Sequence, residues 1–213
     1  MKKLIPNSVL VFFNWQKIKY RNNKKNREKV IHNWKISSRR ELTPHVIKQE
    51  IIREYQKKYS INLLVETGTF RGEMVYAQRD HFKMIISIEL SKELFEIAER
   101  KFRNYPNVEL LNGDSADVIK RVVEKLSEPA IFWLDGHYSG FETAKGELST
   151  PIKKELGAIL NSSLEHIILI DDARLFIGKD DYPTLDELKE FVFAKKSNLT
   201  FSVDDDVIRI VKN

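Results

Sequence analysis

Leu64-Val65-Glu66-Thr67-Gly68-Thr69-Phe70-Arg71-Gly72 is the stretch of this chain that decides its fold. The apolar residues before Glu66 predict a buried parallel strand, because such strands are covered on both faces. Gly68 then permits a tight turn, and Gly72 lets the next helix pack closely with its N-terminal amides toward a ligand. The spacing Glu-x-Gly-x-x-x-Gly departs from the dinucleotide fingerprint Gly-x-Gly-x-x-Gly. We interpret it as a cradle for an adenosine-containing cofactor, with an ordinary strand-to-helix turn as the alternative.

A second predicted strand supports the cofactor interpretation. Met84 to Ile88 is apolar enough to be a buried strand, and Glu89 follows at its end. Ser91 is placed to cap a helix that runs through Lys101. A carboxylate at the end of the second strand suits a ribose, because it can accept hydrogen bonds from both hydroxyls. Glu89 lies about 20 residues after the glycine turn, which is the separation that this role requires.

The third predicted strand, Asn107 to Leu111, ends in the polar turn Asn112-Gly113-Asp114-Ser115. Asp114 is placed to hold an adenine amino group at the same edge of the sheet. Alternatively, Asp114 or Ser115 only caps the helix that runs to Leu126.

Two further strands deliver acidic residues. Ala130 to Leu134 precedes Asp135-Gly136-His137-Tyr138, and His166 to Ile170 precedes Asp171-Asp172. If these strands are neighbours, three carboxylates converge, and like charges that close together are costly without a cation. Their hard oxygen ligands suit Mg²⁺, or otherwise Mn²⁺ or Ca²⁺. In the structural alternative, Asp171 or Asp172 caps a turn and Asp135 pairs with Arg174.

Composition places the basic charge at one end of the chain. The 213 residues contain no cysteine, which excludes disulfides and thiolate chemistry, and carry a formal net charge of +5. Residues 1–60 hold 16 Lys or Arg against 4 Asp or Glu, a balance of +12, so the remainder carries −7. We therefore divide the chain into a basic helical extension, residues 1–58, and one catalytic domain, residues 59–213.

The basic extension begins with an apolar tip, Met1 to Trp15, that is too short and polar to span a bilayer and lacks a signal-cleavage site. We expect a cytoplasmic protein. The tip and the basic stretch from Lys17 to Arg40 fit peripheral contact with the inner membrane face, nucleic-acid binding, or packing of the tip against the core. Thr43-Pro44 predicts the start of a helix that runs through Tyr59.

From Leu63 onward the chain resembles the class I S-adenosylmethionine-dependent methyltransferases, and among them the metal-dependent catechol-type and sugar O-methyltransferases. The resemblance rests on motifs in the family's order, which are Glu66-x-Gly68-x-x-x-Gly72, Ser87-Ile88-Glu89-Leu90, Gly113-Asp114-Ser115, Phe132-Trp133-Leu134-Asp135 and Leu169-Ile170-Asp171-Asp172. It implies that the cofactor is S-adenosyl-L-methionine, bound by Glu66, Gly68, Thr69, Gly72, Glu89, Asp114, Ser115 and Asp135. It also implies a divalent ion held by Asp135, Asp171 and Asp172. Ser202 to Arg209 resembles the family's terminal antiparallel hairpin.

One position departs from the catechol-type pattern. Those enzymes have a lysine base three residues after the first metal aspartate, where this chain has Tyr138, preceded by His137. A catechol acceptor is therefore not expected. His137 becomes the candidate general base, acting beside Asp135, because an imidazole titrates near neutrality. The alternative is that His137 only orients another group.

These observations predict an α/β fold, a doubly wound, seven-stranded, mostly parallel sheet whose last strand is antiparallel, with a basic N-terminal helical extension. We expect a metal-assisted O-methyltransferase that acts on a small hydroxylated acceptor such as a sugar or glycoconjugate, and that forms a homo-oligomer. A nucleic-acid methyltransferase is one alternative, although Asp135-Gly136-His137-Tyr138 is not the Asn/Asp-Pro-Pro-aromatic motif of base-directed enzymes. A non-catalytic or hydrolytic metal-binding protein is the other.

Overall fold

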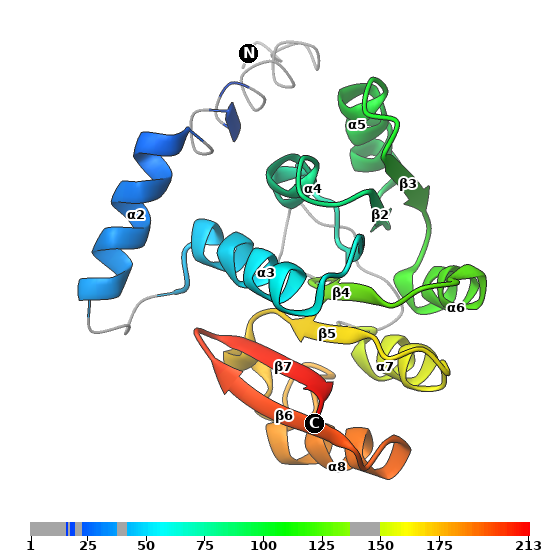
Figure 1. Cartoon of the computed structure of the whole chain (residues 1–213). Coiled ribbons are helices and arrows are strands. Elements are labelled where there is room, and N and C mark those ends of the chain that lie inside the picture. Colours follow the sequence, from blue (N-terminus) through cyan, green and yellow to red (C-terminus); the bar gives the residue numbers. More distant parts are fainter. Residues whose placement is uncertain (1–15, 17, 20–22, 38–41, 137–149) are drawn as a thin grey trace, which may run out of the picture.

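The computed structural model describes residues 16, 18–19, 23–37, 42–136 and 150–213 (Figure 1). Seven strands form one sheet in the order β3-β2-β1-β4-β5-β7-β6. The strands are β1 (Leu63–Thr67), β2 (Met84–Glu89), β3 (Val108–Asn112), β4 (Ala130–Leu134), β5 (Ile167–Ile170), β6 (Leu199–Asp204) and β7 (Val207–Lys212). The helices are α2 (Lys24–Ile36), α3 (His45–Tyr59), α4 (Glu73–Gln78), α5 (Lys92–Phe102), α6 (Ser115–Lys125), α7 (Ile152–Leu160) and α8 (Leu185–Lys195), with a 3-10 turn η1 (Ala173–Leu175).

The sheet confirms the predicted topology. Strands β1 to β5 pair in parallel, and β7 is antiparallel to both of its neighbours, β5 and β6. The chain moves outward from β1 to β3 and then returns to place β4 on the other side of β1. In doubly wound sheets, ligands bind beyond the carboxyl ends of the strands at such a switch point. A ligand site is therefore expected at the carboxyl ends of β1, β2, β4 and β5.

The core lies in two layers, one on each face of the sheet. Alternate residues of a strand point to opposite faces, so Val65 and Phe132 pack with α6, α7 and α8, whereas Leu64 and Trp133 pack with α3, α4 and α5. Figure 1 shows α3 lying along the face of the sheet, with α2 outside it. All five residues of β1 and of β4 are buried, as expected for central parallel strands.

Helix starts follow the predicted signals. The Ser91 hydroxyl accepts a hydrogen bond from the Leu94 amide at 3.3 Å, and the Asp114 carboxylate accepts one from the Ala116 amide at 2.9 Å. Each side chain satisfies an amide that would lack a partner in the first turn. Helix α3 begins directly after Pro44, where the sequence predicted a start.

The described part of the basic extension contains α2 and α3. Arg27 of α2 is buried and donates hydrogen bonds to Gln49 and Glu50 of α3, which joins the two helices. Ile47, Ile51 and Ile52 bury the apolar face of α3 against the core, as predicted. None of the helices within the described ranges is both long and apolar enough to cross a membrane. The tip, residues 1–15, lies outside the described residues, and the boundary at residue 58 stays a prediction.

Candidate active site

Asp135 and Asp171 follow neighbouring strands and lie side by side. Leu134 of β4 is in register with Ile170 of β5, so the residue after each strand reaches the same edge. The sheet hydrogen bonds continue one step further, because the Asp135 amide donates to the Thr67 carbonyl at 3.2 Å and the Asp171 amide donates to the Leu134 carbonyl at 3.0 Å. These backbone hydrogen bonds therefore fix the positions of both aspartates independently of their side-chain contacts.

The three predicted carboxylates do converge. One oxygen from each of Asp135, Asp171 and Asp172 lies within 4.8 Å of the others. Asp171 and Asp172 are buried, and Asp172 adopts a left-handed backbone with a φ of 56°. The Asp172 amide donates to Asp171 Oδ1 at 2.8 Å, which fixes the orientation of that carboxylate. We call these three residues the acid cluster.

Two cations already contact the acid cluster. Lys48 of α3 places its ammonium 2.6 Å from Asp171 Oδ2 and 3.0 Å from Asp172 Oδ1. Arg174 contacts Asp172 Oδ1 at 2.7 Å and also binds Asp206 at the hairpin turn. The structural alternative of an Asp135–Arg174 pair is thus replaced by pairs of Arg174 with Asp172 and Asp206.

The cluster still carries an excess of acid. Burial raises the pKa of Asp171 well above its usual range, and the charge of Asp135 raises it further, in spite of the opposing charge of Lys48. For Lys48 itself, burial lowers the pKa, but the charges of Asp171 and Asp172 outweigh it and raise the pKa above the ordinary lysine value. Burial and the neighbouring acid thus disfavour the charged form of Asp171, a cost that a bound cation relieves.

The glycine turn lies against the acid cluster. Gly68 has a φ of +85°, and a Cβ there would lie 2.5 Å from the Asp135 carbonyl oxygen. Only glycine combines this left-handed conformation with so close an approach. The Gly68 and Thr69 amides donate to the Ile88 carbonyl at 2.9 and 3.2 Å, which ties the turn to β2. A Cβ at Gly72 would lie 2.5 Å from the Phe102 ring of α5, so Gly72 does permit the close packing that the sequence predicted.

Glu66, Ser87 and Thr69 form a buried hydrogen-bonded chain beneath the turn. The Ser87 hydroxyl donates to Glu66 Oε2 at 2.5 Å, and the hydroxyls of Ser87 and Thr69 are 2.6 Å apart. Burial raises the pKa of Glu66 to about 8, the Ser87 hydrogen bond opposes this rise, and Asp135 and Glu89 add to it. Below that pH, Glu66 is a neutral acid that an approaching positive charge would ionise.

Glu89 holds the glycine turn from the end of β2. Its carboxylate accepts from the Phe70 amide at 2.7 Å and from the Ser91 amide at 2.9 Å. Burial raises the pKa of Glu89, and these amide hydrogen bonds lower it. The carboxylate therefore lies beside the turn, where the ribose role predicted for it requires it to be.

Ser115, one of the predicted adenine-side residues, lies close to Gly136. A Cβ at Gly136 would lie 3.1 Å from the Thr67 hydroxyl and 3.3 Å from the Ser115 hydroxyl. Asp114 caps α6, so the alternative role considered for it is present, and its contact with adenine stays a prediction. His137 and Tyr138, which carry the predicted proton transfer, lie outside the described residues.

Sequence reasoning missed Glu155 of α7. Its side chain is buried, hydrogen bonds with Ser115 and Thr67, and leaves Oε1 without a partner among the described residues. Burial raises its pKa to about 7. It lines a cavity of about 10 Å³, the space of one water, together with Asp135 and Tyr182. The sequence did contain a signal for this residue, because a glutamate among the apolar residues of α7 indicates a buried acid.

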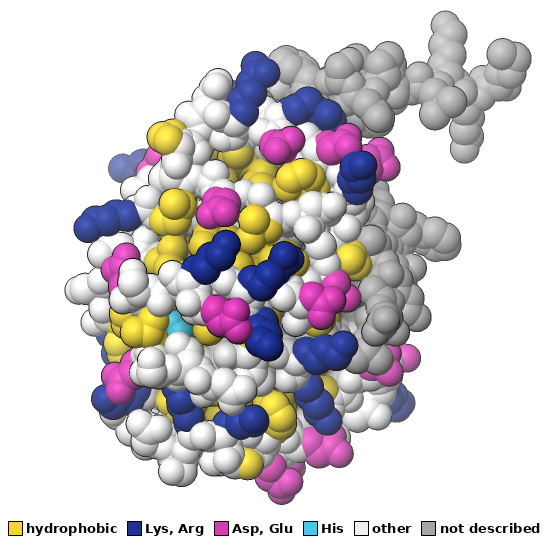
Figure 2. All heavy atoms as spheres, turned by 90° about the vertical axis from the view of Figure 1, so that its right-hand side faces the viewer, with side chains coloured by type: hydrophobic (Ala, Val, Ile, Leu, Met, Phe, Trp, Pro, Cys, Tyr) yellow, Lys and Arg dark blue, Asp and Glu magenta, His cyan; other side chains and the backbone are white. Residues whose placement is uncertain are grey.

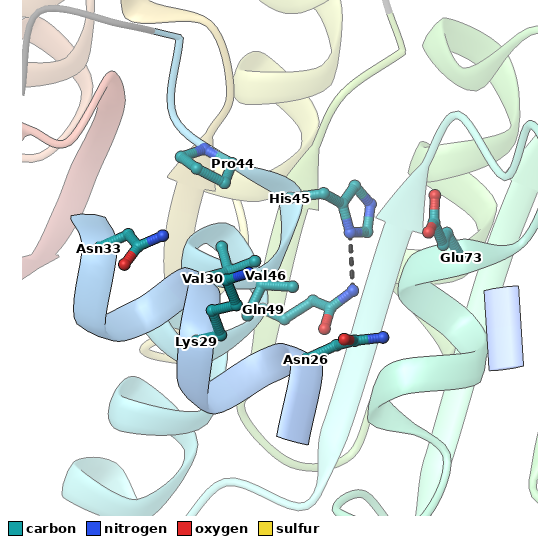
Figure 3. Close-up of a pocket in the computed structure, with 9 residues that line it drawn as sticks. All are labelled: Asn26, Lys29, Val30, Asn33, Pro44, His45, Val46, Gln49 and Glu73. Carbon is teal, nitrogen blue, oxygen red and sulfur yellow. Dashed lines mark hydrogen bonds between the residues drawn. The ribbon is translucent and has the colours of Figure 1, made fainter. Parts of the chain in front are cut away.

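A larger cavity opens between α2 and α3 (Figure 3). Its volume is about 560 Å³, within the range of small-ligand sites. His45 and Gln49 line it from α3, with Gln49 Nε2 2.7 Å from His45 Nδ1, and Glu73 lines it directly after Gly72. The full lining is Asn26, Lys29, Val30, Asn33, Pro44, His45, Val46, Gln49 and Glu73. We call this space the α2–α3 cavity.

The surface on the right-hand side of the molecule in Figure 1 carries no uniform charge. Figure 2 shows lysine and arginine side chains interspersed with acidic and apolar ones across that face. A strong attraction for a polyanion requires clustered positive charge. The face in Figure 2 therefore gives no support to nucleic-acid binding there.

Solved structures provide the comparison with known proteins. An O-methyltransferase from Bacillus cereus in complex with SAH matches with a TM-score of 0.59 at 13% identity, over 99% of this chain and 94% of that one. TomG from Streptomyces achromogenes, an O-methyltransferase in complex with SAM, matches with a TM-score of 0.58 at 14% identity, over 89% of each chain. The SAH-bound methyltransferase PaMTH1 from Podospora anserina matches with a TM-score of 0.55 at 17% identity, over 98% of this chain and 89% of that one.

Comparison of the amino-acid sequence with known families and proteins gives no match. No protein-family model matches the chain, and no curated protein matches it. At these identities the structural likeness shows the fold, which is that of the class I methyltransferases. The predicted fold is confirmed.

Proposed function

We propose that this protein is a methyltransferase that uses S-adenosylmethionine, with a divalent cation at the acid cluster, to methylate a hydroxyl of a small polar acceptor such as a sugar or glycoconjugate. The observation that carries the proposal is the contact between Gly68 and Asp135. A Cβ on Gly68 would lie 2.5 Å from the Asp135 carbonyl oxygen, so the glycine turn, where we place the methyl donor, lies directly against the acid cluster. A donor and a cation bound there would be neighbours, as methyl transfer requires.

The residues of the turn fit the methyl donor. Its methionine end carries an ammonium and a carboxylate, and its adenosine end carries ribose hydroxyls and an adenine amino group. Glu66 lies beneath the turn, and Gly68, Thr69 and Gly72 supply backbone. Glu89 can accept from ribose, and Asp114, Ser115 and Asp135 lie at the adenine side. When bound, the donor supplies the sulfonium methyl group. The three solved structures compared above are complexes with SAM or SAH, which supports this assignment.

The acid cluster fits a hard divalent cation. Its donors are carboxylate oxygens within 4.8 Å of one another, and a positively charged nitrogen, Lys48 Nζ, already occupies a place between two of them. Asp135, Asp171 and Asp172 would hold Mg²⁺, Mn²⁺ or Ca²⁺. Such an ion supplies Lewis acidity, which makes an acceptor hydroxyl easier to deprotonate.

The chain's own residues complete the proposal. We assign His137 as the base that removes the acceptor proton, because it follows Asp135 by two residues in the sequence. Glu66 and Glu89 fix the donor through the turn that they support. Their roles are binding and orientation, which lower the barrier by holding the reacting groups in line.

The α2–α3 cavity is our candidate acceptor site. Amides from Asn26 and Asn33, together with the His45 imidazole, are hydrogen-bonding groups of the kind that recognise hydroxyls. Glu73 lines the cavity and directly follows Gly72, so one wall of the cavity lies next to the glycine turn. A polyhydroxylated acceptor suits this lining better than a flat apolar ring.

Methyl transfer from methyl-labelled S-adenosylmethionine to a panel of monosaccharides, glycosides and catechols tests the proposal. We expect label in a sugar-type acceptor, loss of transfer with a chelator, and restoration with Mg²⁺ or Mn²⁺. D135N should lose at least about 100-fold in transfer rate. The matched control D180N removes the same charge from an exposed aspartate and should keep full activity. Transfer that continues equally in chelator would overturn the metal role.

A further inference from the structure

Lys48 occupies an unusual position for a lysine. It lies on α3 between Pro44 and Ile51 on the helix face that is turned toward the sheet, and its side chain is only 13% exposed. A lysine that buried needs a counter-charge, because transfer of an unpaired ammonium out of water is costly. Its partners are Asp171 and Asp172, which lie 123 and 124 residues further along the chain. The contact therefore joins the N-terminal part of the chain to the acid cluster.

The ammonium and a divalent ion need the same oxygens. Lys48 Nζ is 2.6 Å from Asp171 Oδ2 and 3.0 Å from Asp172 Oδ1. A divalent ion bound to both carboxylates would lie about 2.0–2.6 Å from its ligand oxygens. Two positive charges that share these oxygens would lie too close together to be stable. Binding of one therefore requires displacement of the other.

We propose that Lys48 is an internal counter-ion of the acid cluster, and that a divalent cation binds only by displacing its ammonium. This inference rests on the proposed function, because it takes the acid cluster to be a cation site. Lys48 weakens and so tunes divalent binding, and it stabilises the fold whenever no ion is present. It is a positioning residue and touches neither acceptor nor donor.

Displacement of Lys48 by a cation also affects the α2–α3 cavity, our candidate acceptor site. Lys48 is adjacent to Gln49 in α3, and Gln49 and His45 of the same helix line the α2–α3 cavity. Displacement of Lys48 releases two of the ion pairs that hold this part of α3 to the end of β5 and the start of η1. Cation loading and the shape of the cavity are therefore coupled through one helix.

Binding of Mn²⁺, followed by the electron paramagnetic resonance of the free ion, tests the inference without any activity measurement. K48M keeps the length of the side chain and removes its charge. We expect K48M to bind Mn²⁺ about tenfold or more tightly than the wild type. K57M, which removes the same charge from an exposed position on α3, should bind within about twofold of the wild type. Equal or weaker binding by K48M would overturn the inference while leaving the metal site in place.

Thermal unfolding supplies the second measurement. Without metal, K48M should melt below the wild type, because the carboxylates have lost a counter-charge, and Mn²⁺ should raise its melting temperature more than that of the wild type. If K48M folds only when Mn²⁺ is present, the inference is supported in its strongest form. Absence of Mn²⁺ binding in both proteins would overturn the inference and the metal part of the proposed function together. Binding of SAH, measured separately, would then still test the methyl-donor part.

Discussion

Substitution of Gly68 by alanine perturbs the point where the donor turn meets the acid cluster. The new Cβ would lie 2.5 Å from the Asp135 carbonyl oxygen and 3.0 Å from its carbonyl carbon, and both atoms belong to backbone that cannot move freely. The left-handed φ of +85° adds about 1–2 kcal/mol for a residue with a Cβ. With the steric overlap, we expect a loss of roughly 2–4 kcal/mol in the free energy of unfolding.

That loss corresponds to a fall of about 5–15 °C in melting temperature for a chain of this size. The displaced turn should also weaken SAH binding at least about tenfold, measured by isothermal titration calorimetry. Gly157 is the matched control, because it lies inside α7 and a Cβ there would lie an unstrained 3.9 Å from the Phe191 ring. G157A should stabilise the protein by about 0.5–1 kcal/mol. A G68A protein that melts within about 2 °C of the wild type and binds SAH equally well would show that the close contact of Gly68 with Asp135 is not needed for stability or for SAH binding.

Two buried residues give opposite pH dependences. The pKa of Glu66 is raised to about 8, so its contribution to stability is fully present at acid pH, below the usual value of 4.5, and is lost as the pH rises through 8. E66Q should therefore flatten the decline in stability between about pH 5 and 9, measured by urea unfolding, and an unchanged slope would count against a protonated Glu66. The pKa of His166 is lowered to about 4 by burial and by the charge of Lys196, so its contribution is present above its usual value of 6.5 and is lost as the pH falls through 4. H166N retains an acceptor for the Ala130 amide, 3.1 Å from the native Nδ1, and should weaken the loss of stability on the acid side. An acid-side slope equal to that of the wild type would contradict this.

The sheet and the residues at its carboxyl edge could be predicted from the sequence because each step was local. Apolar runs of four to six residues define the strands, and an acid or glycine directly after a strand must lie at its carboxyl end. That logic placed Glu66, Glu89, Asp135 and Asp171 correctly at one edge. The terminal hairpin was expected only from the family resemblance, and it extends further on both sides than Ser202 to Arg209.

The partners of those acids could not be predicted, because they depend on how distant helices pack. Lys48 lies among the buried residues of α3, and a lysine in such a stripe implies a counter-charge, but the sequence does not say which one. Glu155 interrupts the apolar stripe of α7 in the same way. The α2–α3 cavity depends on the packing of two helices joined by Arg27, and no local pattern encodes that contact. Charged residues on otherwise apolar helix faces were therefore the unused signal.

Calorimetric titration of the wild-type protein with SAH is the decisive measurement, because the proposed reaction requires a donor site at Glu89 and the glycine turn. We expect saturable binding of one SAH per chain, and binding at least about tenfold weaker in E89Q. E93Q, which makes the same change four residues later at an exposed position of α5, should bind like the wild type. The absence of any saturable heat in the wild type, or equal binding by E89Q, would contradict a donor site at Glu89 and the glycine turn.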